Sequence, residues 1–90
     1  MDLQQKIKES LREVIDPEIG LDVVTLGLIR SIKVDEGKAA IGMVLTFPGC
    51  PLAGYLVDMV RRRTLDVEGI EEAWVSLLNE AWDPSMIEQR

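Results

Sequence analysis

The single cysteine, Cys50, has the type and setting that most directly suggest chemistry. It lies between an expected strand ending near Phe47 and an expected helix beginning at Pro51, at or beside the N-cap of that helix. The unpaired amides and positive dipole end of a helix stabilise a thiolate, which is both a nucleophile and a soft-metal ligand. A lone cysteine is also often a small buried hydrophobe. The neighbouring prolines and Gly49 favour the chemical interpretation, because they stiffen the loop and leave the sulfur accessible.

Carboxylates gather in the segment Asp16-Pro17-Glu18-Ile19-Gly20-Leu21-Asp22, which we expect to be a loop. Asp16, Glu18 and Asp22 are close enough in sequence to converge on a cation or to bind backbone amides. The alternative is that Asp16 or Asp22 caps a local turn and that Glu18 is solvated. Thr46 also has two interpretations: its hydroxyl faces the cysteine loop, or its side chain pairs across a sheet.

Two amphipathic helices are expected to position these residues. Apolar residues at three- and four-residue steps predict a helix over 3–15, capped by Asp2 and ended by Pro17. The same periodicity predicts a helix over 51–64, with Pro51 at its first position. The apolar stripes are formed by Leu3, Ile7, Leu11 and Val14, and by Leu52, Tyr55, Leu56, Met59 and Val60.

Three strands are expected between and after the helices. Alternating patterns predict strands over 28–34, 41–47 and 73–78, and Asp35-Glu36-Gly37-Lys38 has the turn chemistry of a hairpin. Trp74 and Trp82 are expected to pack in the core or at an edge, Trp82 as a lid over the core. The order α-β-β-α-β predicts an α+β fold of two layers, a three-stranded mixed sheet with both helices on one face.

Length and composition limit the function. Ninety residues form one domain, 1–90, and no apolar run is long enough to span a membrane. The start of the chain lacks the features of a secretory signal, which predicts a cytoplasmic protein. A net charge of -6 disfavours nucleic acid as a partner.

The run Arg61-Arg62-Arg63 complements a helix C-terminus or forms a docking patch for an acidic partner. Without histidine, neither a zinc set of cysteine and histidine nor a Cys-His catalytic pair can form within one chain.

Several of these residues together resemble the SufT/PaaD-like family of metal-sulfur cluster assembly proteins. The matching features are Asp16-Pro17-Glu18 with Asp22, Leu26-Gly27-Leu28, Thr46 with Cys50-Pro51, and Trp82-Asp83-Pro84. They span nearly the whole chain, and that family's fold has the same α-β-β-α-β order. Ser85 and Met86 depart from the family's pattern, which often has a second proline and an aromatic residue there.

The resemblance implies a pocket in which Cys50 is the central ligand or sulfur carrier and which Asp16, Glu18 and Thr46 line. Cys50, Asp16 and Glu18 would be the metal ligands, and Asp22 would hold the loop. The implied cargo is iron or an iron-sulfur cluster, bound transiently, and the implied partners are the assembly machinery and recipient apo-proteins. A cluster is commonly held by four thiolates, so a homodimer, a small thiol or oxygen ligands would complete the coordination.

The expected function is therefore non-enzymatic assembly or transfer of iron-sulfur clusters during protein maturation. One alternative is an adaptor that recognises client proteins and binds no metal. Another is an accessory protein of an aromatic-ring oxygenase of the phenylacetyl-CoA type. A thiol enzyme is a further alternative, although no resolving cysteine accompanies Cys50.

Overall fold

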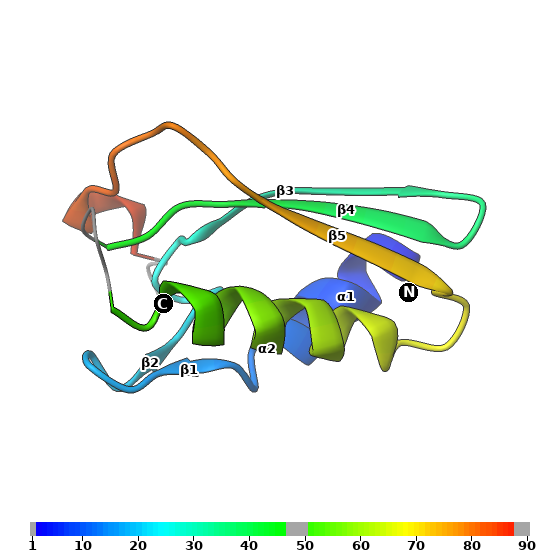
Figure 1. Ribbon diagram of the computed structural model, residues 1–90, viewed down its shortest axis with the longest axis horizontal. Coiled ribbons are helices and arrows are strands. Elements are labelled where there is room, and N and C mark those ends of the chain that lie inside the picture. Colours follow the sequence, from blue (N-terminus) through cyan, green and yellow to red (C-terminus); the bar gives the residue numbers. More distant parts are fainter. Residues whose placement is uncertain (1, 47–50, 88–90) are drawn as a thin grey trace.

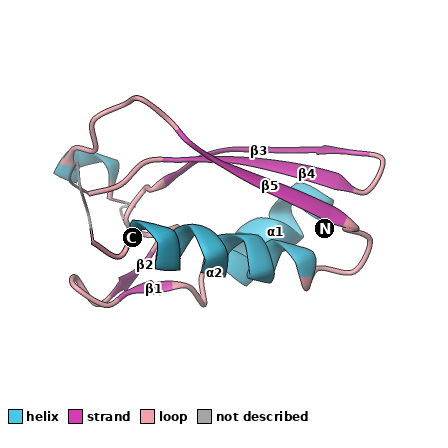
Figure 2. Ribbon diagram, in the orientation of Figure 1, coloured by secondary structure: helices cyan, strands magenta, loops and turns pink. Residues whose placement is uncertain are grey.

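The computed structural model describes residues 2–46 and 51–87, which form a sheet layer on a helix layer (Figure 1). Figure 2 shows both helices on the same side of the larger sheet. The predicted α+β fold with a three-stranded mixed sheet is thus confirmed. The elements are α1 (Leu3–Leu11), β1 (Ile15–Asp16), β2 (Leu21–Asp22), β3 (Ile29–Asp35), β4 (Lys38–Met43), α2 (Ala53–Leu65), β5 (Glu72–Leu77) and the 3-10 helix η1 (Pro84–Met86).

The larger sheet has the strand order β3-β4-β5, so β4 lies in the centre. β3 and β4 are antiparallel, and β4 and β5 are parallel. The β3–β4 turn has positive φ angles at both central residues, 48° at Glu36 and 79° at Gly37. A two-residue turn with this geometry matches the twist of the strands, which explains why the predicted hairpin forms here.

The core lies between the sheet and the two helices. α1 packs against β3 and α2 against β5, and the helices also contact each other. The predicted stripe of α1 faces this core, and Asp2 caps the helix by accepting a hydrogen bond of 2.8 Å from the amide of Gln5. In residues 2–46 and 51–87 no helix has the length and hydropathy needed to cross a bilayer. The fully buried large side chains include Ile7, Leu11, Leu26, Leu28, Ile41, Met43, Leu56 and Val60.

The first helix is shorter than predicted, because it ends at Leu11 rather than near residue 15. The amides of Arg12, Glu13 and Val14 each bond the carbonyl three residues earlier, which tightens and closes the last turn. Val14 remains buried although it has left the helix. The apolar spacing therefore predicted the buried face correctly and the boundary incorrectly.

The acidic segment is a small hairpin, not the loop that the sequence predicted. β1 and β2 pair antiparallel, with Ile15 opposite Asp22 and Asp16 opposite Leu21. The amides of Ile19 and Gly20 bond the carbonyl of Asp16, at 3.2 and 2.7 Å, and so close the turn. Strands of two residues lack the alternation that identifies longer strands, so the pattern was not visible in the sequence.

Smaller shifts occur at the second helix and the strands around it. α2 begins at Ala53, two positions after Pro51, and the predicted face is buried at Leu56 and Val60 while Tyr55 is exposed. β4 ends at Met43, so Thr46 lies beyond the sheet; the predicted strand end at Phe47 lies outside the described residues.

Arg62 and Arg63 lie in the last turn of α2, which is the position that the helix-terminus interpretation predicted. Arg62 also pairs with Asp58 one turn earlier, at 2.8 Å. Arg63 pairs with Glu13 after α1, at 3.1 Å, and so joins the two helical segments.

Candidate functional site

Asp16 is the buried acidic residue of the candidate site. Its exposed fraction is 1%, although it lies in a hairpin near the surface. Its side-chain oxygen Oδ1 accepts a hydrogen bond of 3.0 Å from the amide of Glu18, which is the turn-capping geometry expected for an Asx-turn. Asp16 therefore shapes the turn, and its burial holds a carboxylate at the inner face of the hairpin.

Glu18 lies at the tip of the same hairpin and is exposed. Its backbone contacts Asp16, so the structure brings these two predicted residues together through an amide rather than through their carboxylates. Within the described ranges, no three acidic, cysteine or histidine side chains lie close enough together to hold a metal ion.

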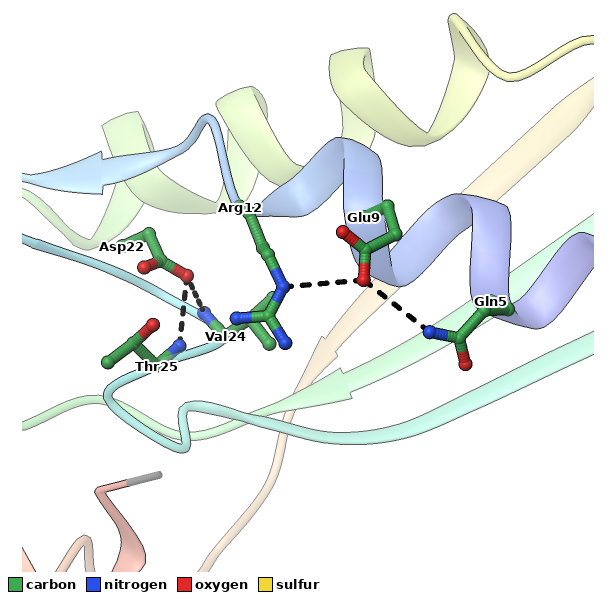
Figure 3. A network of polar contacts seen from close by, with 6 residues as sticks. All are labelled: Gln5, Glu9, Arg12, Asp22, Val24 and Thr25. Carbon is green, nitrogen blue, oxygen red and sulfur yellow. Dashed lines mark hydrogen bonds and ion pairs between the residues drawn. The ribbon is translucent and has the colours of Figure 1, made fainter. Parts of the chain in front are cut away.

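Asp22 caps the turn that follows the hairpin, as the turn-capping interpretation predicted. Its Oδ2 accepts hydrogen bonds from the amides of Val24 and Thr25, at 3.0 and 2.9 Å. Figure 3 shows these bonds, with the side chain of Arg12 reaching from the end of α1 toward this turn and bonded to Glu9. The carboxylate thus orders the chain between β2 and the core residues that follow.

The pKa of Asp22 lies below its ordinary value of 3.8. Burial alone would raise this pKa, since it disfavours the charged form. The hydrogen bonds from Thr25, the positive charge of Arg12 and the amide of Val24 together outweigh burial. Asp22 is therefore held as a carboxylate by structural contacts.

Thr46 lies in a hollow of about 310 Å³ at the end of the larger sheet. The chain leaving β4 lines one side, and the end of β5 with the chain that follows it, up to Trp82, lines the other. Thr46 is half-buried there. The hollow is lined by Leu45, Thr46, Leu77, Leu78, Asn79, Glu80, Ala81 and Trp82.

Trp82 is the lining residue whose role the sequence indicated only in part. It packs against the core, as expected of a lid, and its Nε1 donates a hydrogen bond of 2.8 Å to the carbonyl of Leu26. Asn79 and Glu80 were not singled out, because their place in the hollow depends on the path of the chain after β5. The match of Trp82-Asp83-Pro84 was the signal that pointed to this segment.

Cys50 lies outside the described residues, so its predicted role stays a prediction. The positions of the elements around the candidate site are described, however. Figure 1 shows the β1–β2 hairpin, the start of α2 and η1 toward the same end of the molecule's long axis. The described parts of the candidate site thus belong to one end of the domain.

Comparison with known proteins identifies the family. The profile of a family described as "Iron-sulfur cluster assembly protein" matches residues 4–77. The chain is 39% identical over 83 residues to the "Fe-S protein maturation auxiliary factor YitW" of Bacillus subtilis, covering 91% of this chain and 78% of that protein. It is 38% identical over 72 residues to the "Fe-S protein maturation auxiliary factor SufT" of Staphylococcus aureus, covering 79% and 78%.

A solved structure has the same fold. A domain of unknown function from Bacillus anthracis, DUF59, superposes with a TM-score of 0.91 at 33% identity, covering 97% of this chain and 85% of that one. The fold and the sequence features define a small α+β domain of the cluster-assembly class. The chain belongs to the iron-sulfur cluster assembly protein family, which confirms the resemblance.

Proposed function

We propose that this protein is a non-enzymatic, cytoplasmic factor in the maturation of iron-sulfur proteins, with Cys50 as transient ligand to iron, a cluster or sulfur. The observation that carries the proposal is the family match over residues 4–77. Relatives with similar sequences are named as maturation auxiliary factors. A match to an "Iron-sulfur cluster carrier protein" of Mycobacterium tuberculosis, 35% identical over 77 residues, covers 84% of this chain and 20% of that protein.

The proposed site combines the thiolate of Cys50 with oxygen atoms of three described residues. Asp16 offers a buried carboxylate, Glu18 an exposed one and Thr46 a hydroxyl in the hollow beside Trp82. We assign Cys50, Asp16 and Glu18 as metal ligands and Thr46 as a lining residue. Thiolate ligation is what iron-sulfur clusters prefer, and a carboxylate suits iron outside a cluster.

The ligand set of one chain is incomplete, which suits a carrier. The sequence contains one cysteine and no histidine. A cluster commonly held by four thiolates therefore needs ligands from a second copy, a small thiol or a recipient protein. A cargo held by few bonds is released readily to an apo-protein, so the partners we propose are the assembly machinery and recipient apo-proteins.

Anaerobic reconstitution tests the proposal. The wild-type protein and Cys50→Ala are incubated with iron and sulfide, and bound iron, bound sulfide and the visible absorption spectrum are measured. We expect cluster absorption in the wild type and its loss in Cys50→Ala. Ser76→Ala, a change of similar size at an exposed position, is the matched control and should load as the wild type does.

Equal loading of the wild type and Cys50→Ala would exclude Cys50 as a ligand, and no loading of either would exclude the carrier function. Asp16→Asn and Glu18→Gln then separate the two carboxylates, since each keeps the side-chain size and removes the charge. A carboxylate that binds iron should lower the iron content when it is replaced. Unchanged iron content in both variants would assign these residues to the turn alone.

A client adaptor that binds no metal is the second candidate. The observation in its favour is the exposure of large apolar side chains, among them Tyr55, Trp74 and Leu77, each with an exposed fraction of 51%. Exposed apolar side chains can contact partner proteins, although these three lie on different faces of the domain. Maturation of a client in cells that carry Cys50→Ala would favour the adaptor.

A further inference from the structure

The two edges of the larger sheet differ in how they are protected. β3, at one edge, has a register irregularity between Ile29 and Ser31 and a lysine, Lys33, near its middle. The side chain of Gln4 on α1 donates a hydrogen bond of 2.8 Å to the carbonyl of Ile32. Bulges, lysines and covering elements are the devices by which proteins prevent a further strand from pairing with an edge. The β3 edge is therefore protected.

β5, at the other edge, has an open side. The amide of Glu72 bonds the carbonyl of Gly37 and the amide of Leu78 bonds that of Met43, so even-numbered residues direct their backbone groups toward β4. Because a strand has a period of two, the N–H and C=O groups of Ala73, Val75 and Leu77 point away from the sheet. No strand in residues 2–46 and 51–87 pairs with this side.

The side chains of β5 do not protect this edge. The strand Glu72–Leu77 contains neither proline nor lysine, and its register with β4 is regular. Trp74 and Leu77 are each 51% exposed and, three positions apart in a strand, lie on opposite faces of the sheet. They would contact a further strand from both sides. An unprotected edge of this kind is a template for strand addition.

The charged side chains around β5 determine which kind of strand can pair with its open edge. Glu71 and Glu72 precede or begin the strand, Glu80 follows it, and all three are exposed. Glu72 is 3.8 Å from Lys38, an exposed ion pair that water screens. Two copies paired antiparallel through β5 would bring Glu71 and Glu72 of one toward Glu80 of the other. With a net charge of -6 as well, self-pairing is disfavoured.

We propose that the β5 edge binds an extended segment of a client protein, apolar in its middle and lysine- or arginine-rich at its ends. The proposal rests on the proposed maturation function and names the surface that selects clients. The C-terminal end of β5 leads into the hollow that Leu77, Trp82 and Thr46 line. A segment added to β5 is thereby presented beside the candidate site.

The test uses a synthetic peptide of alternating valine and threonine with two lysines at each end. Its binding to the full-length protein, without iron, is followed by nuclear magnetic resonance of the backbone amides. We expect the amides of Val75 and Leu77 to shift and to become protected from hydrogen exchange. The same peptide with glutamates in place of lysines should bind more weakly, and the difference should shrink at high salt.

Val75→Pro removes an outward N–H while leaving the bonds to β4 in place. Loss of one such hydrogen bond should weaken peptide binding about tenfold. Ser76→Ala, on the same strand, is the control and should bind as the wild type does. Because a proline can also disturb the strand, a peptide N-methylated at every valine and threonine provides a second test. It keeps the side chains, lacks the N–H donors of both edges and should bind more weakly than the unmethylated peptide.

Absence of peptide binding, or binding unaffected by both Val75→Pro and N-methylation, would overturn the proposal. A wild-type dimer in sedimentation that Val75→Pro dissociates would assign the edge to a second copy and would also overturn it. The peptide titration contains no iron, so it is independent of the reconstitution experiment. Cys50→Ala should still bind the peptide; if cluster loading fails while peptide binding persists, the carrier function alone is excluded.

Discussion

At the scale of single residues, Asp22 shows a carboxylate that orders the backbone. Two amides converge on its Oδ2, and Arg12 adds a favourable charge. The bonded segment connects the β1–β2 hairpin to the core residues Val23 and Leu26. The position of Asp16 and Glu18 relative to the core thus depends in part on Asp22.

Asp22→Asn tests this role. The change keeps a side-chain oxygen but removes the charge that strengthens both hydrogen bonds, so we expect the free energy of unfolding to fall by about 1 kcal/mol at neutral pH. Urea denaturation measures it. Asp35→Asn, at the exposed end of β3, is the control and should stay within about 0.5 kcal/mol of the wild type. Equal stability of all three proteins would contradict the role.

The lowered pKa of Asp22 predicts that the stability difference between the wild type and Asp22→Asn depends on pH. The folded-state pKa of Asp22 lies below 3.8, so its carboxylate contributes stability that is complete above the unfolded pKa and declines as the pH falls through the folded value. The stability difference between the wild type and Asp22→Asn should therefore shrink below about pH 4. Denaturation at several pH values measures it. If the difference in the free energy of unfolding grows on acidification, the pKa of Asp22 is raised in the folded state and not lowered.

Gly27 and Gly20 have similar backbone angles but different surroundings, which predicts different losses of stability when each is replaced by alanine. Both have positive φ, 79° and 84°, but a Cβ at Gly27 would lie 2.8 Å from the carbonyl carbon of Met86 and even closer to its oxygen, whereas a Cβ at Gly20 meets nothing. Gly20→Ala should destabilise by about 1–2 kcal/mol through backbone strain alone. Gly27→Ala should lose about 1–3 kcal/mol more, because backbone atoms must move apart. Equal losses in thermal or urea unfolding would contradict the close approach.

At the scale of elements, the segment after β5 is joined to the loop before β3. Trp82 bonds the carbonyl of Leu26, and Asp83 caps η1 by accepting a hydrogen bond of 2.8 Å from the amide of Ser85. The close approach of Gly27 and Met86 lies in the same region. One wall of the hollow beside Thr46 is therefore positioned by contacts with a segment distant in sequence.

Trp82→Phe tests this link. The phenyl ring keeps most of the apolar contact but cannot donate to Leu26, so we expect a loss of about 1 kcal/mol in the free energy of unfolding. Trp74→Phe, at an exposed position of β5, should change stability by less than about 0.5 kcal/mol. Urea unfolding followed by far-ultraviolet circular dichroism avoids dependence on tryptophan fluorescence. A larger effect of Trp74→Phe would reverse the roles assigned to the two tryptophans.

At the scale of the whole molecule, one cysteine per chain determines how a cluster can be held. Two chains supply two thiolates, and small thiols can supply the rest of the usual four. We expect reconstituted protein to carry one cluster for two chains and to sediment as a dimer, with loading that rises when glutathione is added. Apo-protein should sediment as a monomer. Full loading of a monomer without added thiol would show that other ligands complete the site.

Apolar spacing predicted the helical faces, and turn chemistry predicted the hairpin at Glu36 and Gly37. The α-β-β-α-β order of the elements predicted the mixed sheet, because a helix between two strands allows them to pair in parallel. The β1–β2 hairpin was missed, since two-residue strands have no measurable period. A sharper signal was present in the turn residues Pro17 and Gly20 between Ile15 and Leu21. Of the two places expected for Trp74, the core is wrong, since Trp74 is 51% exposed on β5 at the edge of the sheet.

The family, the absence of histidine and the single cysteine could all be read from the order of residues alone, because they depend on residue types and spacing and on no contact. The folded structure was needed to show that Asp16 is buried, that Thr46 and Trp82 line one hollow, and that one sheet edge is protected while the other is open. Each of these depends on contacts between segments far apart in the chain, which local pattern does not encode.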